Sequence, residues 1–330
     1  MGITIKEIAD LCGVSTGTVD RALNNRTGIS DKTKARILSI AEQMNYKPDY
    51  VAQSLARGRT MTIGVVLFDL YNRLFAQLLN AIESEARQRG YFVDVVLTDK
   101  QPETELSCLN HLVNRKVDGI ILFSVNQGQD FQDYLTSLAL PIVTICNRIT
   151  GDWPYIGIND REAMKDATRH VLSKGYQQIV FVCPPLAYRG IRNIHTQEER
   201  LQGCLEALEP RKAEIELTII QDRDYIQSIA ALPLERGRTA IMCTCDVHAL
   251  EVLHYLQVIR GLQVPEDIGV MGFDDIDVLK YVKPKLATVE YNVEAMGKLA
   301  VDSLLRHMNE AQPHEQEPLV AYSLVAGQSI

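Results

Sequence analysis

From Met61 onward the chain alternates short apolar runs with amphipathic stretches, and this alternation constrains the fold more than any other feature. Short apolar strands separated by helices indicate parallel sheets that are covered by helices on both faces. Eight such strands fit two sheets better than one, so we predict an α/β body with two doubly wound parallel-sheet subdomains. The predicted strands are 62–68, 92–97, 119–124, 142–146, 179–183, 216–220, 240–244 and 268–273, and helices are predicted at 74–88, 103–114 and 161–172.

The first sixty residues have a different pattern, that of three short helices. Thr4 and Glu7 have the spacing of a capping box, Ser15 can cap a second helix, and Ser30 can open a third. Gly13 ends the first helix. A tight glycine turn between the first two of three helices predicts a helix-turn-helix head. The residues expected to be buried in it are Ile5, Ile8, Ala9, Val19, Ala22, Leu23, Ala35, Ile37, Leu38, Ile40, Ala41 and Met44.

The second helix of this head leaves Thr16, Gly17, Thr18, Asp20 and Arg21 exposed. Short side chains allow a helix backbone to approach base edges, and an arginine suits a bidentate contact with guanine. A protein-binding helical bundle with solvated polar faces would show the same pattern, so the pattern alone leaves both interpretations open.

The net charge of −8 is unevenly distributed along the chain. Residues 1–60 contain four Lys and five Arg against six acidic residues, which gives +3 and leaves −11 for the other 270 residues. The field that attracts phosphates is local, so a basic head on an acidic body is compatible with DNA binding. Because the head is only mildly basic, we expect two heads to act together.

The chain has the composition of a cytoplasmic globular protein. It has no apolar run of about 18 residues, so we expect no membrane span, and polar residues interrupt its N-terminus, which argues against a secretory signal. Most of its seven cysteines lie in or beside apolar runs and are expected to be reduced, buried thiols. Cys243 and Cys245 are separated by a single residue, which is not the spacing of a zinc-binding pair, so we expect no zinc site, and no cofactor is predicted.

Four motifs of the first fifty residues resemble the head of the LacI/GalR family of transcriptional regulators. They are Ile-Lys-Glu-Ile-Ala at 5–9, Gly-Val-Ser at 13–15, Thr-Val-Asp-Arg-Ala-Leu-Asn at 18–24, and Asn-Tyr-Lys-Pro at 45–48. The resemblance covers nearly the whole chain. It implies a homodimeric regulator, expected to be a repressor, whose affinity for a pseudo-palindromic operator in double-stranded DNA changes when a small molecule binds the body. The implied DNA contacts in the head are Thr4, Ser15, Thr16, Gly17, Thr18, Arg21, Asn24, Ser30, Thr33 and Tyr46.

The segment after Pro48 is implied to be a hinge helix that folds only on DNA. It is too short to be stable alone in water, so coupling its folding to docking is physically reasonable. The resemblance places DNA contacts at Gln53 and at Leu55, whose side chain would wedge open a central base step from the minor groove. The alternative is that Leu55 is an ordinary apolar residue of a linker helix.

The resemblance also implies that the body consists of two subdomains of the periplasmic sugar-binding type, joined by crossings near 154–158, 286–289 and 317–321. The predicted boundaries are 1–46 for the head, 47–60 for the hinge and linker, about 61–156 with 290–317 for the N-subdomain, and about 157–289 with 318–330 for the C-subdomain. Ligands of open α/β sheets bind beyond the carboxyl ends of the strands, so we expect a sugar or sugar-like effector in the cleft between the subdomains.

Candidate effector-binding residues follow the predicted strands or match a family motif. Arg200 belongs to an Arg-Leu-x-Gly motif whose arginine reaches the effector, and Tyr291 could stack on a sugar. Asp246 could instead cap a helix, and Arg73 and Arg148 could be solvated surface charges. The full predicted set is Asp69, Asn72, Arg73, Phe75, Ser124, Arg148, Arg200, Asp246, Asp274 and Tyr291.

The chain departs from the family pattern at four places. Asp20 and Asp49 put carboxylates near DNA, where Asp20 could contact cytosine or pair with a neighbouring basic side chain. Cys245 replaces an amide in the cleft. Arg148 replaces an acid, which suggests the hypothesis of an anionic, sugar-like effector.

Other functional classes fit the sequence less well. It contains no dinucleotide-binding or Walker-type motif, and its histidines have no evident nucleophile partner, so we do not expect an enzyme. A transport binding protein would share the body but would lack the head. A regulator controlled by a protein corepressor remains an alternative.

Overall fold

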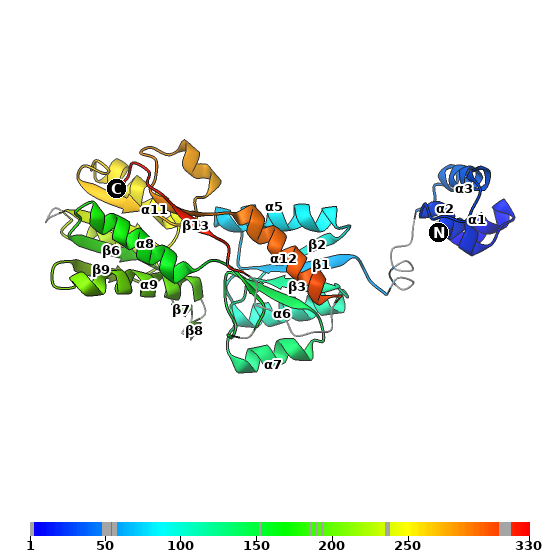
Figure 1. Cartoon of the computed structure of the whole chain (residues 1–330), viewed down its shortest axis with the longest axis horizontal. Helices are drawn as coiled ribbons and strands as arrows, with labels where there is room; N and C mark the ends of the chain where they lie inside the picture. The colour runs from blue at the N-terminus through cyan, green and yellow to red at the C-terminus, as the bar shows by residue number, and fades with distance from the viewer. Residues whose placement is uncertain are drawn as a thin grey trace. The chain divides into compact units, whose positions relative to one another are not determined.

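A computed structural model of the chain describes residues 3–47, 54, 58–151, 153–184, 187–188, 191–192, 195–234, 238–309 and 318–330. The chain divides into two compact units, Met1–Thr60 and Met61–Ile330 (Figure 1). None of the described helices is long and apolar enough to cross a membrane.

The head contains three helices, α1 (Ile5–Cys12), α2 (Thr16–Leu23) and α3 (Asp31–Gln43). Gly13 ends α1 in the left-handed conformation, with φ at 60°, which turns the chain into α2. Ile8, Val19 and Ile37, one from each helix, are fully buried and form the centre of a small core.

The third helix is less buried than its sequence predicted. Ile37 and Ala41 face the core, but Leu38 is 41% exposed, Met44 is 49% exposed, and Ala35 is also exposed. Residues four apart share one face of a helix, and Leu38 is turned about 100° away from the face of Ile37. In a core this small only one face of α3 is covered.

The first sheet of the body is parallel and has the strand order β2-β1-β3-β4-β5. Side chains alternate along β1: Val65 belongs to the core on the side of α5 and α12, and Val66 belongs to the core on the side of α6 and α7. Figure 1 shows these helix pairs on opposite faces. The strands are β1 (Thr62–Leu67), β2 (Phe92–Leu97), β3 (Gly119–Leu122), β4 (Ile142–Ile145) and β5 (Tyr155–Ile156), and the helices are α5 (Arg73–Gln88), α6 (Pro102–Asn114), α7 (Gln129–Ser137) and α12 (Val293–His307).

The second sheet is also parallel, with the order β11-β10-β6-β9. Helices α8 and α9 pack against each other, and α11 contacts β10 and β11. The strands are β6 (Gln178–Val182), β9 (Glu216–Ile220), β10 (Thr239–Cys243) and β11 (Ile268–Met271), and the helices are α8 (Asp160–Ser173), α9 (His195–Leu208), α10 (Tyr225–Ala230) and α11 (Asp246–His254).

The two sheets confirm the predicted fold class, and each of the eight predicted strands corresponds to one of their strands. Outside them, β12 (Thr288–Tyr291) pairs antiparallel with β13 (Tyr322–Val325), next to two of the predicted crossings, and β7 (Ala187–Tyr188) pairs with β8 (Ile191–Arg192). The short helices η1 (Glu209–Arg211), η2 (Tyr255–Ile259) and η3 (Asp277–Tyr281) complete the described elements.

Candidate functional site

Helix α2 presents a small polar surface to solvent. Its N-terminal cap is Ser15, whose Oγ accepts a hydrogen bond from the Thr18 N–H at 3.3 Å. Thr16, Gly17 and Arg21 are exposed, whereas Val19 and Ala22 are buried in the head core. The candidate guanine-contacting arginine therefore lies on the solvent side of α2 together with the small residues predicted to contact DNA.

Other predicted DNA contacts lie at the starts of α1 and α3. Thr4 donates its N–H to the Glu7 carboxylate at 2.7 Å, and this hydrogen bond, with that from the Thr4 hydroxyl, holds the pKa of Glu7 below its ordinary value. The Oγ of Ser30 accepts a hydrogen bond from the Thr33 N–H at 3.2 Å. Helix N-termini attract phosphates because their amides and dipoles are oriented outward, so these caps fit contact with the DNA backbone.

Asp20 pairs within the head, which answers a question that the sequence left open. Its carboxylate lies 3.2 Å from the Arg26 guanidinium and accepts a hydrogen bond from Asn24 Nδ2 at 2.8 Å. The negative charge on α2 is therefore partly compensated by a neighbouring cation. Tyr46, another predicted DNA contact, is half-buried and packs on the head core. Asp49, Gln53 and Leu55 lie outside the described residues.

The body contains a cavity of about 480 Å³ at the carboxyl ends of strands from both sheets. Phe68, Phe123 and Cys146 follow β1, β3 and β4, and Thr244 and Asp274 follow β10 and β11. Its position is that predicted for the effector site. Six of the predicted effector residues line it, namely Asp69, Asn72, Phe75, Arg200, Asp274 and Tyr291.

Arg200 is the central cation of this cavity and is 6% exposed. Its Nε donates to Asp160 Oδ1 at 2.8 Å, and its Nη1 donates to Asp274 Oδ1 at 3.2 Å and to the Thr244 carbonyl. The guanidinium carbon lies 3.6 Å from the ring centroid of Phe273. Burial alone would lower the pKa of Arg200, but Asp160 and Asp274 raise it above its ordinary value. The guanidinium is thus held in one orientation.

Asp274 is placed in the cavity by an unusual backbone conformation. Its φ of 114° is one that side-chain-bearing residues rarely adopt, and such strain is commonly kept at ligand sites. Its Oδ1 also accepts a hydrogen bond from the Tyr291 hydroxyl at 2.9 Å. Burial raises the pKa of Asp274 to about 6, and Arg200 opposes this rise. Tyr291 thus orients the acid, in addition to any stacking on the effector.

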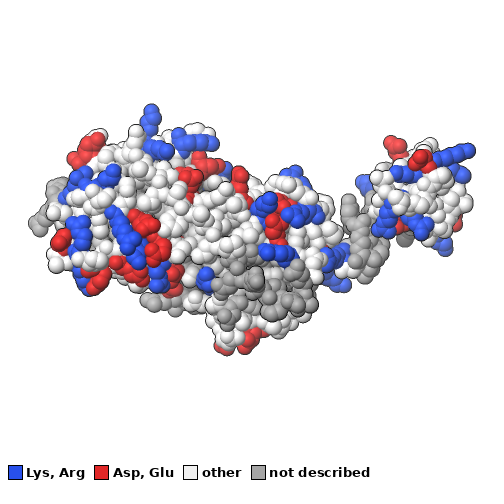
Figure 2. All heavy atoms as spheres, in the orientation of Figure 1, with Lys and Arg blue, Asp and Glu red and all other residues white. Residues whose placement is uncertain are grey.

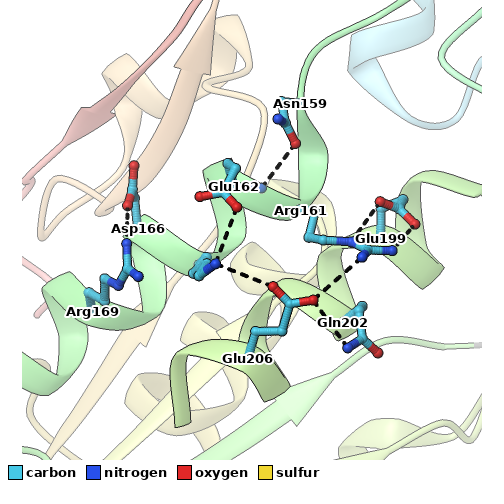
Figure 3. Close-up of polar contacts among 9 residues, drawn as sticks. Asn159, Arg161, Glu162, Asp166, Arg169, Glu199, Gln202 and Glu206 are labelled. Atoms are coloured by element: carbon cyan, nitrogen blue, oxygen red, sulfur yellow. Dashed lines mark hydrogen bonds and ion pairs between the residues drawn. The ribbon is translucent and has the colours of Figure 1, made fainter. Parts of the chain in front are cut away.

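Close packing of α8 on α9 brings Arg200 to Asp160. Gly203 lies one turn after Arg200, and a Cβ at this position would come within 2.1 Å of the Arg161 carbonyl oxygen. Charged pairs join the same helices on their outer side (Figure 3): Arg161 lies 2.7 Å from Glu199, and Lys165 lies 3.3 Å from Glu206. Figure 2 shows acidic and basic side chains mixed over this region. The glycine of the Arg-Leu-x-Gly motif is therefore required for this close packing.

Four predicted effector residues, Arg73, Ser124, Arg148 and Asp246, are not among the residues that line the cavity. The Ser124 hydroxyl is buried and donates to Glu105 at 2.7 Å, and Arg148 lies over the Tyr155 ring at 4.3 Å. The role of Arg148 in selecting an anionic effector stays a prediction.

The other two of these residues bind protein groups. Asp246 is fully buried and accepts hydrogen bonds from the Thr288 hydroxyl at 2.7 Å and the Ile276 N–H at 3.0 Å, so it joins α11 to the loop after β11. Arg73 extends from α5 to Asp277 and makes two hydrogen bonds of 2.8 Å. It forms an ion pair between the halves of the body instead of lining the cavity.

The sequence reasoning missed several cavity residues. Asp160 begins α8 immediately after a predicted crossing, and this position was the available signal for it. No motif indicated the others, because they are brought together by strands far apart in the chain. Missed cavity residues with polar groups are Tyr71, Asp99, Lys100, Asp160, Thr196, Gln197, Arg223, Tyr225, Thr244 and His248.

Comparisons with known proteins agree with both parts of this description. A family model described as "Bacterial regulatory proteins, lacI family" matches residues 4–49, and one described as "Periplasmic binding protein-like domain" matches 168–330. The chain is 29% identical over 317 residues to catabolite control protein A of Priestia megaterium, with 94% of each covered. It is 29% identical over 329 residues to the transcriptional repressor PurR of Haemophilus influenzae strain PittEE, covering 98% of this chain and 95% of the relative.

A solved structure of the lac repressor dimer, bound to operator and the anti-inducer ONPF, matches with a TM-score of 0.81 at 25% identity. The match covers 100% of this chain and 99% of that one. The family predicted from the head motifs is thus confirmed. The chain belongs to the lacI family of bacterial regulatory proteins, as a DNA-binding transcriptional regulator with a helix-turn-helix head and a periplasmic-binding-protein-like body.

Proposed function

We propose that two heads of a homodimer bind the half-sites of a pseudo-palindromic operator, with α2 in the major groove of each. The observation that carries this proposal is the solvent side of α2, where Arg21 is exposed on a helix whose other side is buried through Val19 and Ala22. Arg21 would read guanine, and the absence of a side chain at Gly17 would allow close approach. Thr4, Ser15, Ser30 and Thr33 would bind phosphates.

The hinge residues Gln53 and Leu55 are proposed to act in the central minor groove, with Leu55 as a wedge. This part of the proposal rests on the sequence alone. The protein would act in the cytoplasm, where the DNA is. It would act as a repressor, in keeping with the name of the PurR relative.

The body is proposed to sense a small sugar or sugar-like effector in its cavity. Arg200 of α9 and Asp274 after β11 provide a donor and an acceptor from the half of the body that contains the second sheet. Phe75 of α5 and Asp69 after β1 line the cavity from the half that contains the first sheet. A ligand bound between two half-domains changes the angle between them. A coupling of about 1–3 kcal/mol to the heads would change operator occupancy 5- to 150-fold.

Exposed apolar side chains on the body support dimerisation. Phe92 is 69% exposed, Val258 is 65% exposed and Tyr281 is 78% exposed. In a homodimer, a second copy of the chain would cover some of these side chains.

We propose no catalytic reaction for the cavity. The adjacent acids Asp274 and Asp275 do not act as a pair there, because only Asp274 lines the cavity and its Oδ1 is held by Arg200 and Tyr291.

The proposal is tested by selecting operators from random duplex DNA with the full chain. Wild type should enrich a pseudo-palindrome with a flexible central step, Arg21→Ala should lose a guanine preference, and Leu55→Ala should lose the central step. Arg87→Ala, which removes an exposed arginine of α5, is the matched control and should behave as wild type. Absence of sequence preference in wild type, with and without a metabolite mixture, would refute the proposal.

A further inference from the structure

Three buried polar atoms at the cavity have no hydrogen-bond partner among the described residues. They are Gln197 Oε1 on α9, Thr244 Oγ1 after β10, and His248 Nδ1 on α11. All three residues line the cavity. Buried polar groups in folded proteins are almost always paired, so a group left unpaired calls for an explanation. Residues from three separate elements of one cavity wall carry such atoms, and a ligand that supplies several hydrogen bonds would account for them.

The charges around the cavity argue against a net anionic ligand. The lining contains the cations Lys100, Arg200 and Arg223, and the four carboxylates of Asp69, Asp99, Asp160 and Asp274. Arg200 is already bound by two of these carboxylates, and Lys100 Nζ lies 3.5 Å from Asp69. An anion would have to compete with acids that are already in place, whereas an uncharged hydroxyl can pair with atoms that are not engaged.

His248 packs against Tyr225 and is uncharged at neutral pH. Its ring lies 5.2 Å from that of Tyr225 in an edge-to-face arrangement, and the Tyr225 hydroxyl donates to Glu251 on the same helix as His248. Burial and the nearby Lys100 lower the pKa of His248 to about 4. A neutral imidazole nitrogen can pair with a hydroxyl but offers no positive charge to an anion.

We propose that His248 is a specificity-determining residue that hydrogen-bonds an uncharged, hydroxyl-bearing effector, next to Thr244 and Gln197. This inference rests on the proposed effector function of the cavity. It adds to that function that the effector is uncharged. It also adds His248, a residue that neither a sequence motif nor the end of a strand had indicated.

The test uses the full chain and two probes prepared from one cell extract by anion exchange, the unretained fraction and the retained anionic fraction. Each is titrated against operator binding at pH 7.5. His248→Phe removes the polar atom and keeps an aromatic ring. His248→Asn restores a polar atom close to the position of Nδ1. His254→Phe is the matched control, because His254 is exposed on the same helix.

We expect the unretained fraction to shift operator affinity of wild type. His248→Phe should need about tenfold more of that fraction, the ratio expected for one lost hydrogen bond, and His248→Asn should recover most of the response. Operator binding without any fraction should be the same for all variants, which a merely structural role of His248 would not predict. Activity only in the anionic fraction, or an equal response of wild type and His248→Phe, would overturn the inference. Activity in neither fraction would overturn the proposed effector function itself.

Discussion

Replacing Gly203 by alanine tests whether close packing of α8 on α9 holds Arg200 in place. The added Cβ would lie 2.1 Å from the Arg161 carbonyl oxygen, whereas ordinary contacts begin at 3.4 Å. Both atoms belong to helix backbones, so α8 and α9 must separate locally by about 1.3 Å. That displacement exceeds what the 2.8 Å hydrogen bond from Arg200 to Asp160 can absorb.

Overpacking of this kind costs about 1–3 kcal/mol, which for a body of this size lowers Tm by roughly 2–12 °C. The higher helix propensity of alanine offsets up to about 1 kcal/mol of that cost. We therefore expect a lower Tm of the full chain and a higher effector concentration for half response.

Thermal unfolding by circular dichroism measures the first effect, and operator binding titrated with effector measures the second. Gly151→Ala is the control, because a Cβ at Gly151 meets no atom within 4 Å. Wild-type values of both quantities in Gly203→Ala would refute the argument that this glycine positions Arg200.

Three further predictions concern other parts of the chain. Burial raises the pKa of Glu105 from 4.5 to about 7, so its contribution to stability is fully present below pH 4.5 and is lost as the pH rises through 7. The difference in unfolding free energy between Glu105→Gln and wild type, measured by urea titration, should therefore grow in favour of the variant by up to about 3 kcal/mol from pH 4.5 to pH 8. Equal pH profiles of the two proteins would contradict this. Gly17→Ala should stabilise the head by up to about 1 kcal/mol, which would be measured as a higher Tm of the head. The added methyl group should at the same time weaken operator binding, and tighter binding would disprove the role proposed for α2. Asp277→Asn breaks the ion pair with Arg73 and should change the effector response with little change in Tm. Glu83→Gln is the control and should leave the effector response unchanged, because its ion pair with Arg87 lies within one helix. Identical effector responses of the two variants would count against this prediction.

Local signals in the sequence were sufficient for the elements of the fold. The caps at Thr4, Ser15 and Ser30 are read from a few neighbouring residues, and all three have the predicted cap hydrogen bonds. Most strands of the two sheets are apolar and buried because both faces of each sheet are covered, whereas the edge strands β2 and β9 are partly exposed. The apolar pattern of α3 overestimated burial at Leu38 and Met44, because burial there depends on how large the surrounding core is.

The cavity could be predicted only in part, because strand ends fix where a residue lies but not what its side chain contacts. Ser124 and Asp246 do follow strands, yet both turn to protein groups that the sequence cannot place, Glu105 and Thr288. His248 lies within a helix, outside the strand-end rule. Its part in the cavity depends on packing between distant segments.

Polar contacts between the two halves of the body, among the residues that the structure describes, show how a small ligand could control it. Arg73 reaches Asp277 from α5, the Thr196 N–H donates to Asn147 Oδ1 at 3.4 Å, and Tyr291 holds Asp274. The Arg73–Asp277 pair is substantially exposed, and such pairs contribute little to stability. An effector that pairs with Arg200 in one half and with residues after β1 in the other would therefore add polar contacts comparable to those already present between the halves. Its binding can thus set the angle between the halves without disturbing the core of either half.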